Sequence, residues 1–159
     1  MLRILRSHDV AFVVVGGVAA RLRGAPLLTQ DVDITPERTP DNIGRLAAAL
    51  EEMEARLRSA SEPDGVEFLF DADLLATKPL WTLTTTYGDL DLVLEPAGFT
   101  GFEELADGAS PLRVARQPDL YVEVASLSDV IASKEAAGRE KDLAALPLLR
   151  TTLRESATE

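Results

Sequence analysis

An apolar run, two glycines and two aspartates follow one another in the first part of the chain. The run over 11–15 reads Ala-Phe-Val-Val-Val, a continuous and β-branched stretch that is typical of a strand buried on both faces. Gly16 and Gly17 follow it directly, and Asp31 and Asp33 begin the next apolar segment. This order predicts a strand, a turn into a helix, and a second strand that carries both carboxylates.

Asp31 and Asp33 are two positions apart, so on a strand their side chains share one face while the neighbouring apolar residues point to the core. Mg²⁺ is commonly held by one or two carboxylates together with the phosphates of a substrate. Glycines between a strand and a helix expose backbone N–H groups to an anion. The sequence therefore predicts an Mg²⁺ or Mn²⁺ site at Asp31 and Asp33, a triphosphate cradle at Gly16 and Gly17, and a loop ordered by Thr29. The alternative is a tight turn followed by solvent-facing carboxylates.

A second aspartate pair, Asp89 and Asp91, lies between leucines on another predicted strand. If this strand neighbours the Asp31–Asp33 strand, three carboxylates converge. Without a cation these carboxylates would repel one another and raise at least one pKa. We therefore expect Asp91 to be the third metal ligand, with Asp89 as its substitute, and two ions to serve an in-line displacement. The alternative is a solvated carboxylate on an edge strand.

Basic residues gather near the end of the chain, at Lys134, Arg139 and Lys141. On an uninterrupted helix, Lys134 and Lys141 fall nearly on one face, and Arg139 joins them only if Gly138 bends the path. Lysine and arginine both offset phosphate charge, so phosphate binding is the predicted role. The competing interpretations are a surface lysine on an amphipathic helix for Lys134 and, for Arg139 and Lys141, exposed ion pairs of little energetic value with Glu135, Glu140 or Asp142.

The remaining periodicities predict a mixed β-sheet flanked by helices, of the α/β (α+β) class. An apolar stripe after Thr39 and Pro40 predicts a helix capped by Thr39. A second helix is expected over 18–23, after the glycines. The predicted strands beyond the first two cover 66–70, 81–86, 89–94 and 121–125. A C-terminal helical segment is expected over 126–153, with disturbances at Gly138 and Pro147.

Composition sets limits on the function. A chain of 159 residues with 46% hydrophobic residues predicts a single domain over 1–159. The absence of cysteine and the single histidine exclude a zinc site of nitrogen and sulfur ligands. A net charge of −11 argues against broad attraction to nucleic acid. No apolar run approaches the ~20 residues that span a bilayer, and no signal-peptide pattern is present, so we expect a cytoplasmic protein without a membrane partner.

These motifs resemble the nucleotidyltransferase superfamily that includes DNA polymerase β. The resemblance is greater to small bacterial proteins related to the abortive-infection toxin AbiEii. It rests on 16–17 and 29–34, on Tyr-Gly-Asp-Leu-Asp-Leu over 87–92, and on 128–143, and so extends over nearly the whole chain. It implies a nucleotidyltransferase fold and Mg²⁺-dependent transfer of a nucleoside monophosphate from an NTP. The implied acceptors are RNA ends, proteins or small antibiotics.

The first hypothesis is therefore an enzyme. Asp31 and Asp33 would hold Mg²⁺ on the NTP, Asp91 would orient the acceptor hydroxyl, and Lys134 would neutralise the leaving group. The favoured role is a toxin of a toxin–antitoxin pair acting on RNA, with antibiotic modification next. The second hypothesis is a catalytically inactive module of the same fold, acting as an antitoxin or regulatory subunit with a partner protein. A third is another phosphoryl-transfer or phosphohydrolase use of the same carboxylates.

Overall fold

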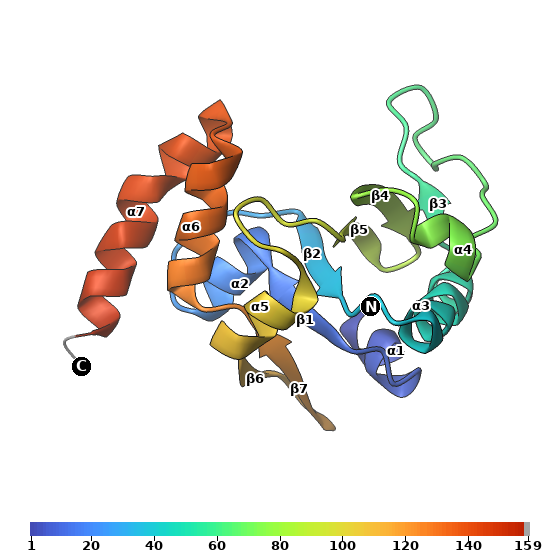
Figure 1. Cartoon of the computed structure of the whole chain (residues 1–159), viewed down its shortest axis with the longest axis horizontal. Coiled ribbons are helices and arrows are strands. Elements are labelled where there is room, and N and C mark those ends of the chain that lie inside the picture. Colours follow the sequence, from blue (N-terminus) through green and yellow to red (C-terminus); the bar gives the residue numbers. More distant parts are fainter. Residues whose placement is uncertain (158–159) are drawn as a thin grey trace.

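A computed structural model describes residues 1–157, and a seven-stranded mixed sheet forms its centre, in the order β3-β4-β5-β2-β1-β7-β6 (Figure 1). The strands are β1 (Phe12–Val15), β2 (Asp31–Pro36), β3 (Arg56–Leu57), β4 (Leu80–Thr85), β5 (Gly88–Val93), β6 (Ser110–Arg116) and β7 (Asp119–Val124). The helices are α1 (Leu2–Ser7), α2 (Gly16–Leu22), α3 (Pro40–Glu52), α4 (Ala72–Leu75), α5 (Phe102–Gly108), α6 (Leu127–Ala137) and α7 (Glu140–Ser156). The prediction of a mixed sheet flanked by helices is confirmed.

Strand β1 is a buried interior strand next to the middle strand β2, and its burial agrees with its apolar run. All four of its residues are buried. It pairs with β2 in the antiparallel direction and with β7 in the parallel direction. In this register Val15 lies opposite Asp33, so the end of β1 meets the aspartates of β2 directly before the chain turns into α2.

The pairing of β2 with β5 decides where the acidic side chains meet. The two strands are parallel, with Asp31 opposite Asp89 and Asp33 opposite Asp91. Ile34, Leu90 and Leu92 are fully buried, so the aspartates alternate with core residues on both strands. The in-phase alternation places both aspartate pairs on one face of the sheet.

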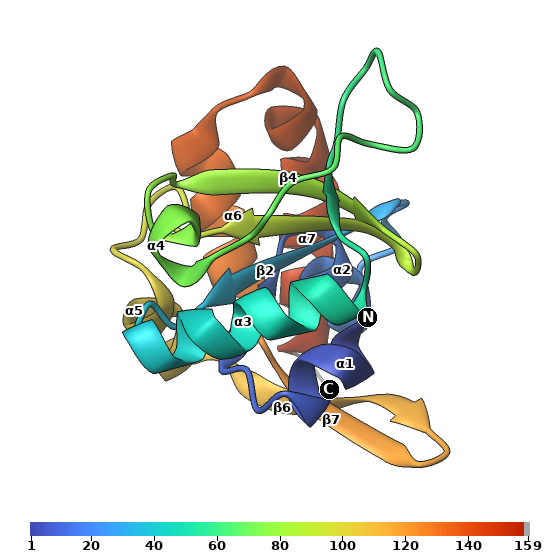
Figure 2. The same ribbon diagram turned by 90° about the vertical axis from the view of Figure 1, so that its right-hand side faces the viewer.

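Helices cover both faces of this sheet. Helices α1 and α3 lie side by side on one face, and α2, α6 and α7 lie on the other (Figures 1 and 2). Asn42 of α3 is fully buried and exchanges hydrogen bonds with both the N–H and the carbonyl of Ala11, which ties α3 to the start of β1. Thr39 occupies the N-cap position of α3, as predicted, although its hydroxyl donates to Glu37 and makes no hydrogen bond to the helix.

The structure differs from the predicted elements in three other places. Helix α2 begins at Gly16 and includes both glycines, instead of starting at residue 18. The predicted strand over 66–70 is wrong beyond a single bridge between Val66 and Leu57, because Phe68 and Phe70 pack on Trp81, with ring centroids 5.8 and 6.1 Å from it. Strand β6 was not predicted, although it pairs along most of its length with β7.

The predicted C-terminal helical segment contains two helices. Gly138 adopts a left-handed conformation, with φ of +62°, and ends α6. Helix α7 then continues to Ser156 with Pro147 inside it. Within the described residues, no helix is both long enough and apolar enough to span a bilayer.

Candidate metal centre

Three carboxylates meet where β2 and β5 lie side by side. Each of Asp31, Asp33 and Asp91 offers one oxygen, and these three oxygens all lie within 4.8 Å of one another. The three side chains are partly buried, and their strands fix them in adjacent register positions. The structure thus brings the three predicted acidic residues together, and it places Asp89 one register step away, opposite Asp31.

Asp33 is the most perturbed of the three. Burial raises its pKa to about 7, and the negative charges of Asp31 and Asp91 add to the increase. The Gly17 N–H, which hydrogen-bonds the Asp33 carboxylate, and the charge of Lys134 act in the opposite direction. A carboxyl group with such a pKa is only partly ionised at neutral pH, so a cation that replaces the proton relieves the repulsion.

Asp91 is held by a residue that the sequence did not single out. Burial raises its pKa, Arg58 opposes this rise, and the charges of Asp31 and Asp89 add to it. Nη2 of Arg58 donates to Oδ1 of Asp91 over 2.9 Å. The third carboxylate therefore has a fixed orientation on one side, through a hydrogen-bonded ion pair.

The two glycines permit the close approach of Asp33 and Thr29. A Cβ on Gly16 would overlap with Oδ2 of Asp33 and lie 2.8 Å from its Cγ, and Gly16 has a φ of +62°. A Cβ on Gly17 would lie 2.9 Å from both Cβ and Oγ1 of Thr29. The Gly17 N–H serves Asp33. The two glycines therefore leave the space that Asp33 and Thr29 occupy, and they also line the predicted triphosphate site.

Thr29 contacts the first aspartate. Its hydroxyl lies 3.0 Å from Oδ1 and 3.1 Å from the carbonyl oxygen of Asp31, both within hydrogen-bonding distance. The contact places Asp31 relative to the chain that enters β2, which is the role expected from its position before the aspartates.

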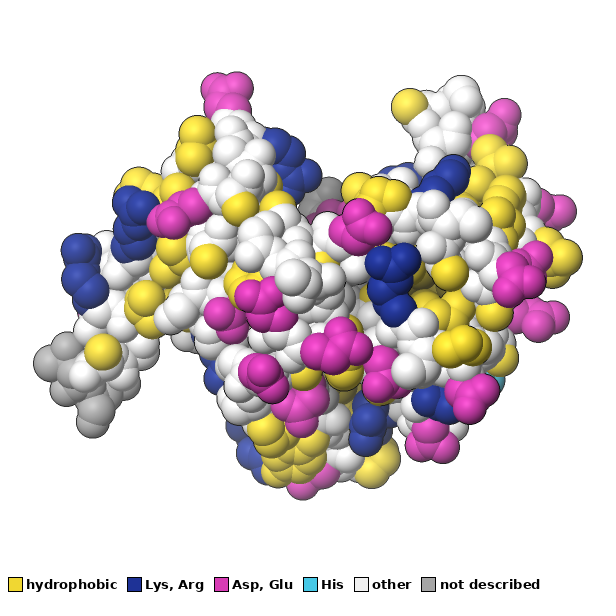
Figure 3. Space-filling view, viewed as in Figure 1, with side chains coloured by type: hydrophobic (Ala, Val, Ile, Leu, Met, Phe, Trp, Pro, Cys, Tyr) yellow, Lys and Arg dark blue, Asp and Glu magenta, His cyan; other side chains and the backbone are white. Residues whose placement is uncertain are grey.

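A cleft of about 1010 Å³ opens next to the carboxylates. Residues of β2, β5 and the start of α2 line one side of it, and residues of α6 and α7 line the other. Figure 3 shows the surface hollowed between the α6–α7 side and the β4–β5 side of the molecule. The predicted basic residues all lie on this cleft: Lys134, Arg139 and Lys141.

Two of these basic residues converge on a buried acid. The Asp142 side chain is only 1% exposed and accepts from Nζ of Lys134 over 2.8 Å and from Nε of Arg139 over 2.5 Å. Burial opposes ionisation, but the hydrogen bonds and charges of Arg139 and Lys134 outweigh it and lower the pKa of Asp142. The alternative of an ion pair between Arg139 and Asp142 is therefore confirmed, and the Arg139 side chain is itself 62% exposed, but its acidic partner is buried. Lys141 is exposed on the cleft.

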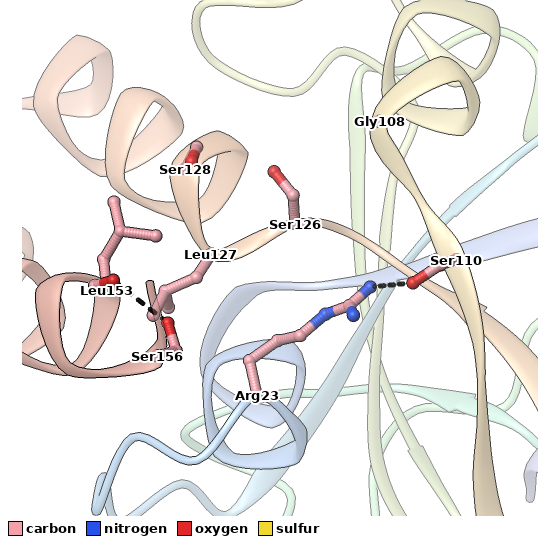
Figure 4. Close-up of a pocket in the computed structure, with 8 residues that line it drawn as sticks. All are labelled: Arg23, Gly108, Ser110, Ser126, Leu127, Ser128, Leu153 and Ser156. Atoms are coloured by element: carbon pink, nitrogen blue, oxygen red, sulfur yellow. Dashed lines mark hydrogen bonds between the residues drawn. The ribbon is translucent and has the colours of Figure 1, made fainter. Parts of the chain in front are cut away.

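A second cavity of about 410 Å³ lies between α6, α7 and the end of α2 (Figure 4). Its one basic residue, Arg23, donates to the carbonyls of Val124 and Ala125 and to the hydroxyl of Ser110. Ser126 accepts from the backbone of Asp129 and so caps α6. The polar groups of this cavity thus tie the end of α2 to the sheet and cap α6.

Sequence reasoning missed the contact of Arg58 with Asp91 and the burial of Asp142 at the cleft. Arg58 follows the two-residue strand β3, and the only signal for it is the short alternation in Arg56-Leu57-Arg58. Asp142 was considered only as an exposed partner of Arg139 or Lys141. Its burial was not apparent because the packing of α7 on α6 depends on the turn at Gly138.

The donor set fits a divalent cation with oxygen ligands. Three carboxylate oxygens at this spacing match the ligand type that Mg²⁺ and Mn²⁺ prefer. Lys134 and Arg139 neutralise Asp142 and Arg58 contacts Asp91 on one side, whereas burial and the neighbouring carboxylates leave Asp33 with a raised pKa. The acidic cluster is therefore the part of the cleft at which an added cation relieves the most repulsion.

Comparisons with known proteins support the fold assignment. No protein-family model and no curated protein sequence matches the chain. The structure is similar to the solution structure of the antibiotic-resistance factor ANT(2'')-Ia, with a TM-score of 0.55 and 18% sequence identity over 96% of this chain and 80% of that one. This similarity concerns the fold. The chain therefore forms a single domain that resembles a nucleotidyltransferase fold. The domain contains a mixed seven-stranded sheet with helices, and a cluster of three aspartates lies at one face of the sheet.

Proposed function

We propose that this protein is a metal-dependent nucleotidyltransferase that moves a nucleoside monophosphate from an NTP to an acceptor. The observation that carries the proposal is the cluster of Asp31, Asp33 and Asp91 on adjacent strands of a fold that resembles a nucleotidyltransferase fold. Mg²⁺ bound there would neutralise phosphate charge and polarise the reacting phosphorus.

Each acidic residue has a distinct proposed task. Asp31 and Asp33 would hold the cation and, through it, the triphosphate, and Asp91 would complete the cation site. Asp91 accepts the proton of the acceptor hydroxyl, whose oxygen forms a bond to the α-phosphorus. The bond from that phosphorus to the oxygen bridging to the β-phosphate breaks, and pyrophosphate leaves. Gly16 and Gly17 leave room for the phosphates beside Asp33.

The basic side of the cleft is proposed to bind the leaving group. Lys134 and Arg139 face the cleft and are both held by Asp142, so their positions are fixed before a ligand enters. Lys141 supplies a further positive charge at the cleft. Preorganised cations of this kind stabilise the charge that develops on pyrophosphate.

For the acceptor, we propose a small molecule. The net charge of −11 disfavours a large anionic acceptor such as RNA, and the similar structure belongs to an antibiotic-resistance factor. The role of a toxin acting on RNA, related to AbiEii and paired with an antitoxin, and a phosphohydrolase use of the same carboxylates are alternatives that the experiment below distinguishes.

The test is incubation of the protein with Mg²⁺ and NTPs labelled at the α-phosphate, together with pools of RNA, protein and small hydroxyl compounds. We expect label in the small-molecule pool and release of pyrophosphate. Asp33→Asn should abolish the signal, whereas Asp64→Asn, which changes an exposed aspartate in the loop after β3, should preserve it. Label in RNA would support the toxin alternative. Phosphate release without transfer would support the phosphohydrolase. Tight NTP binding with neither result would support an inactive binding module.

A further inference from the structure

Arg58 is positioned next to the acidic cluster by its own backbone. It follows β3 directly, and its N–H donates to the carbonyl of Thr82 on β4 over 3.0 Å. Thr82 in turn lies opposite Asp91 in the pairing of β4 with β5. The guanidinium therefore reaches Asp91 across one intervening strand.

The side chain of Arg58 holds Asp91 more firmly than Asp89. Its Nη2 lies 2.9 Å from Oδ1 of Asp91 and 2.9 Å from the carbonyl oxygen of Leu83. Its Nε lies 3.3 Å from Oδ2 of Asp89 but is buried and makes no hydrogen bond. The guanidinium is therefore hydrogen-bonded to Asp91 and is only a charge neighbour of Asp89.

The charges around this contact are unequal. Asp31, Asp33, Asp89 and Asp91 contribute four carboxyl groups within one register step of one another, and Arg58 contributes a positive charge at their edge. A cation bound by the three clustered oxygens would lie near that positive charge and share Asp91 with it. The bound cation and the Arg58 guanidinium would repel each other, because both are positive and partial burial reduces the screening by water.

We propose that Arg58 is the built-in counter-ion of Asp91, which fixes one oxygen of this carboxylate and weakens the binding of a divalent cation to the nucleotide-free cluster. This inference rests on the cation site of the proposed function. Its consequence is that the cation binds firmly only when the phosphate oxygens of an NTP add to the ligand set. Arg58 is thus a positioning residue that couples metal binding to nucleotide binding.

The test is titration of Mn²⁺ into nucleotide-free protein by calorimetry, which needs no acceptor and no turnover. Arg58→Gln removes the charge but keeps an N–H donor for Asp91, and we expect it to bind Mn²⁺ about threefold to tenfold more tightly than the wild type. Arg58→Lys keeps the charge and should bind within about twofold of the wild type. If thermal unfolding shows that Arg58→Gln is not folded, Arg58→Met repeats the measurement with an apolar side chain.

The matched control is Arg56→Gln. Arg56 lies on β3 two residues earlier, and its guanidinium pairs with Glu67 over 3.3 Å instead of with the cluster. Its Mn²⁺ affinity should equal that of the wild type. If Arg58 had only a structural role, its substitution would weaken Mn²⁺ binding. Tighter Mn²⁺ binding by Arg58→Gln is therefore specific to the proposed counter-ion.

Unchanged or weaker Mn²⁺ binding by the charge-removing variant would overturn the inference about Arg58, and so would equal tightening by Arg58→Lys. A wild type that binds no Mn²⁺ either alone or in the presence of an NTP would contradict the proposed function instead. In that case, Mn²⁺ binding gained by Arg58→Gln would still support the counter-ion, and no gain would overturn it.

Discussion

Acidic residues are buried on both sides of the cleft, but their pKa values are shifted in opposite directions. On the sheet side, Asp31, Asp33 and Asp91 lie together, and burial with mutual repulsion raises the pKa of Asp33 to about 7. On the helical side, Asp142 is more deeply buried, yet its pKa is lowered because Arg139 and Lys134 both donate to it. Burial alone therefore does not decide whether an acid is a functional site.

This difference distinguishes an acid that is paired within the protein from acids that are proposed to bind a cation. The charge of Asp142 is neutralised within the protein, so its contribution is to link α6 to α7 and to hold Lys134 and Arg139 in place at the cleft. The charges of the acidic cluster are neutralised only in part, at the side of Asp91 that Arg58 contacts. Opposite effects of substituting Asp33 and Asp142 on the free energy of unfolding would establish this distinction.

The largest expected effect is on catalysis at the sheet side. Asp33→Asn should reduce nucleotidyl transfer by about a thousandfold, because one cation ligand is lost. The same change should raise the free energy of unfolding of the metal-free protein by about 1–2 kcal/mol, because it removes a buried charge next to two others. Turnover assays and urea denaturation in the presence of a chelator measure the two effects. Turnover close to that of the wild type would contradict the assignment.

Substitution at the helical side should have the opposite effect on stability. Asp142→Ala should lower the free energy of unfolding by about 2–4 kcal/mol, because Lys134 and Arg139 lose a buried partner. The control is Glu135→Ala, which breaks the exposed pair between α6 and Arg150 of α7 and should cost less than about 1 kcal/mol. Urea denaturation of both variants checks this, and equal losses would show that Asp142 has no special role.

The glycine beside the cluster gives a steric test. Gly16→Ala should lower the free energy of unfolding by about 2–3 kcal/mol, because a Cβ there overlaps with Asp33 and the backbone has a positive φ. Gly88→Ala is the control, since its φ is also positive, at +108°, but a Cβ there meets no atom within 4 Å. Its cost should be about 1 kcal/mol. Thermal unfolding compares them, and a smaller loss at Gly16 than at Gly88 would contradict the close approach.

The smallest expected effect is a dependence of stability on pH. Native Asp33 binds a proton up to a pH of about 7, whereas the unfolded chain releases it near 3.8. The free energy of unfolding of the metal-free protein should therefore decrease by about 1 kcal/mol or more as the pH rises from about 4 through about 7. Asp142 has the opposite sign, because its stabilising contribution is present above its unfolded pKa and is lost only at lower pH.

Denaturation over this pH range, with a chelator present, measures the effect, and Asp33→Asn isolates it. The difference in stability between the variant and the wild type should grow with pH. A difference that stays constant between about pH 5 and about pH 8 would show that Asp33 is ionised throughout.

The sequence was sufficient to predict the sheet side of the cleft. Period-two alternation around Asp33 and Asp91 is a local signal, and parallel pairing of two such strands brings their acidic residues together without further information. The apolar run over 11–15 likewise predicted the buried strand β1. Local patterns also predicted the break at Gly138, since a left-handed residue at a helix end is commonly glycine.

The remaining features depend on tertiary packing that no local pattern encodes. Arg58 contacts Asp91 because β4 pairs with both β3 and β5 and so holds the two residues one strand apart. Strand β3 has only two residues, so its alternation is not distinctive in the sequence. The burial of Asp142 depends on the angle between α6 and α7. At 66–70, the aromatic residues favoured a strand by propensity, but Phe68 and Phe70 pack on Trp81 instead.

The most direct test of the cation site is thermal unfolding of the wild type and Asp33→Asn in the presence of an NTP, with and without Mg²⁺, at about pH 8, where Asp33 is mostly ionised. A ligand that binds only the native state raises the melting temperature. We expect Mg²⁺ to raise that of the wild type by several degrees and to leave that of Asp33→Asn nearly unchanged. No increase in the wild type, or an equal increase in both proteins, would contradict a cation site at the three aspartates.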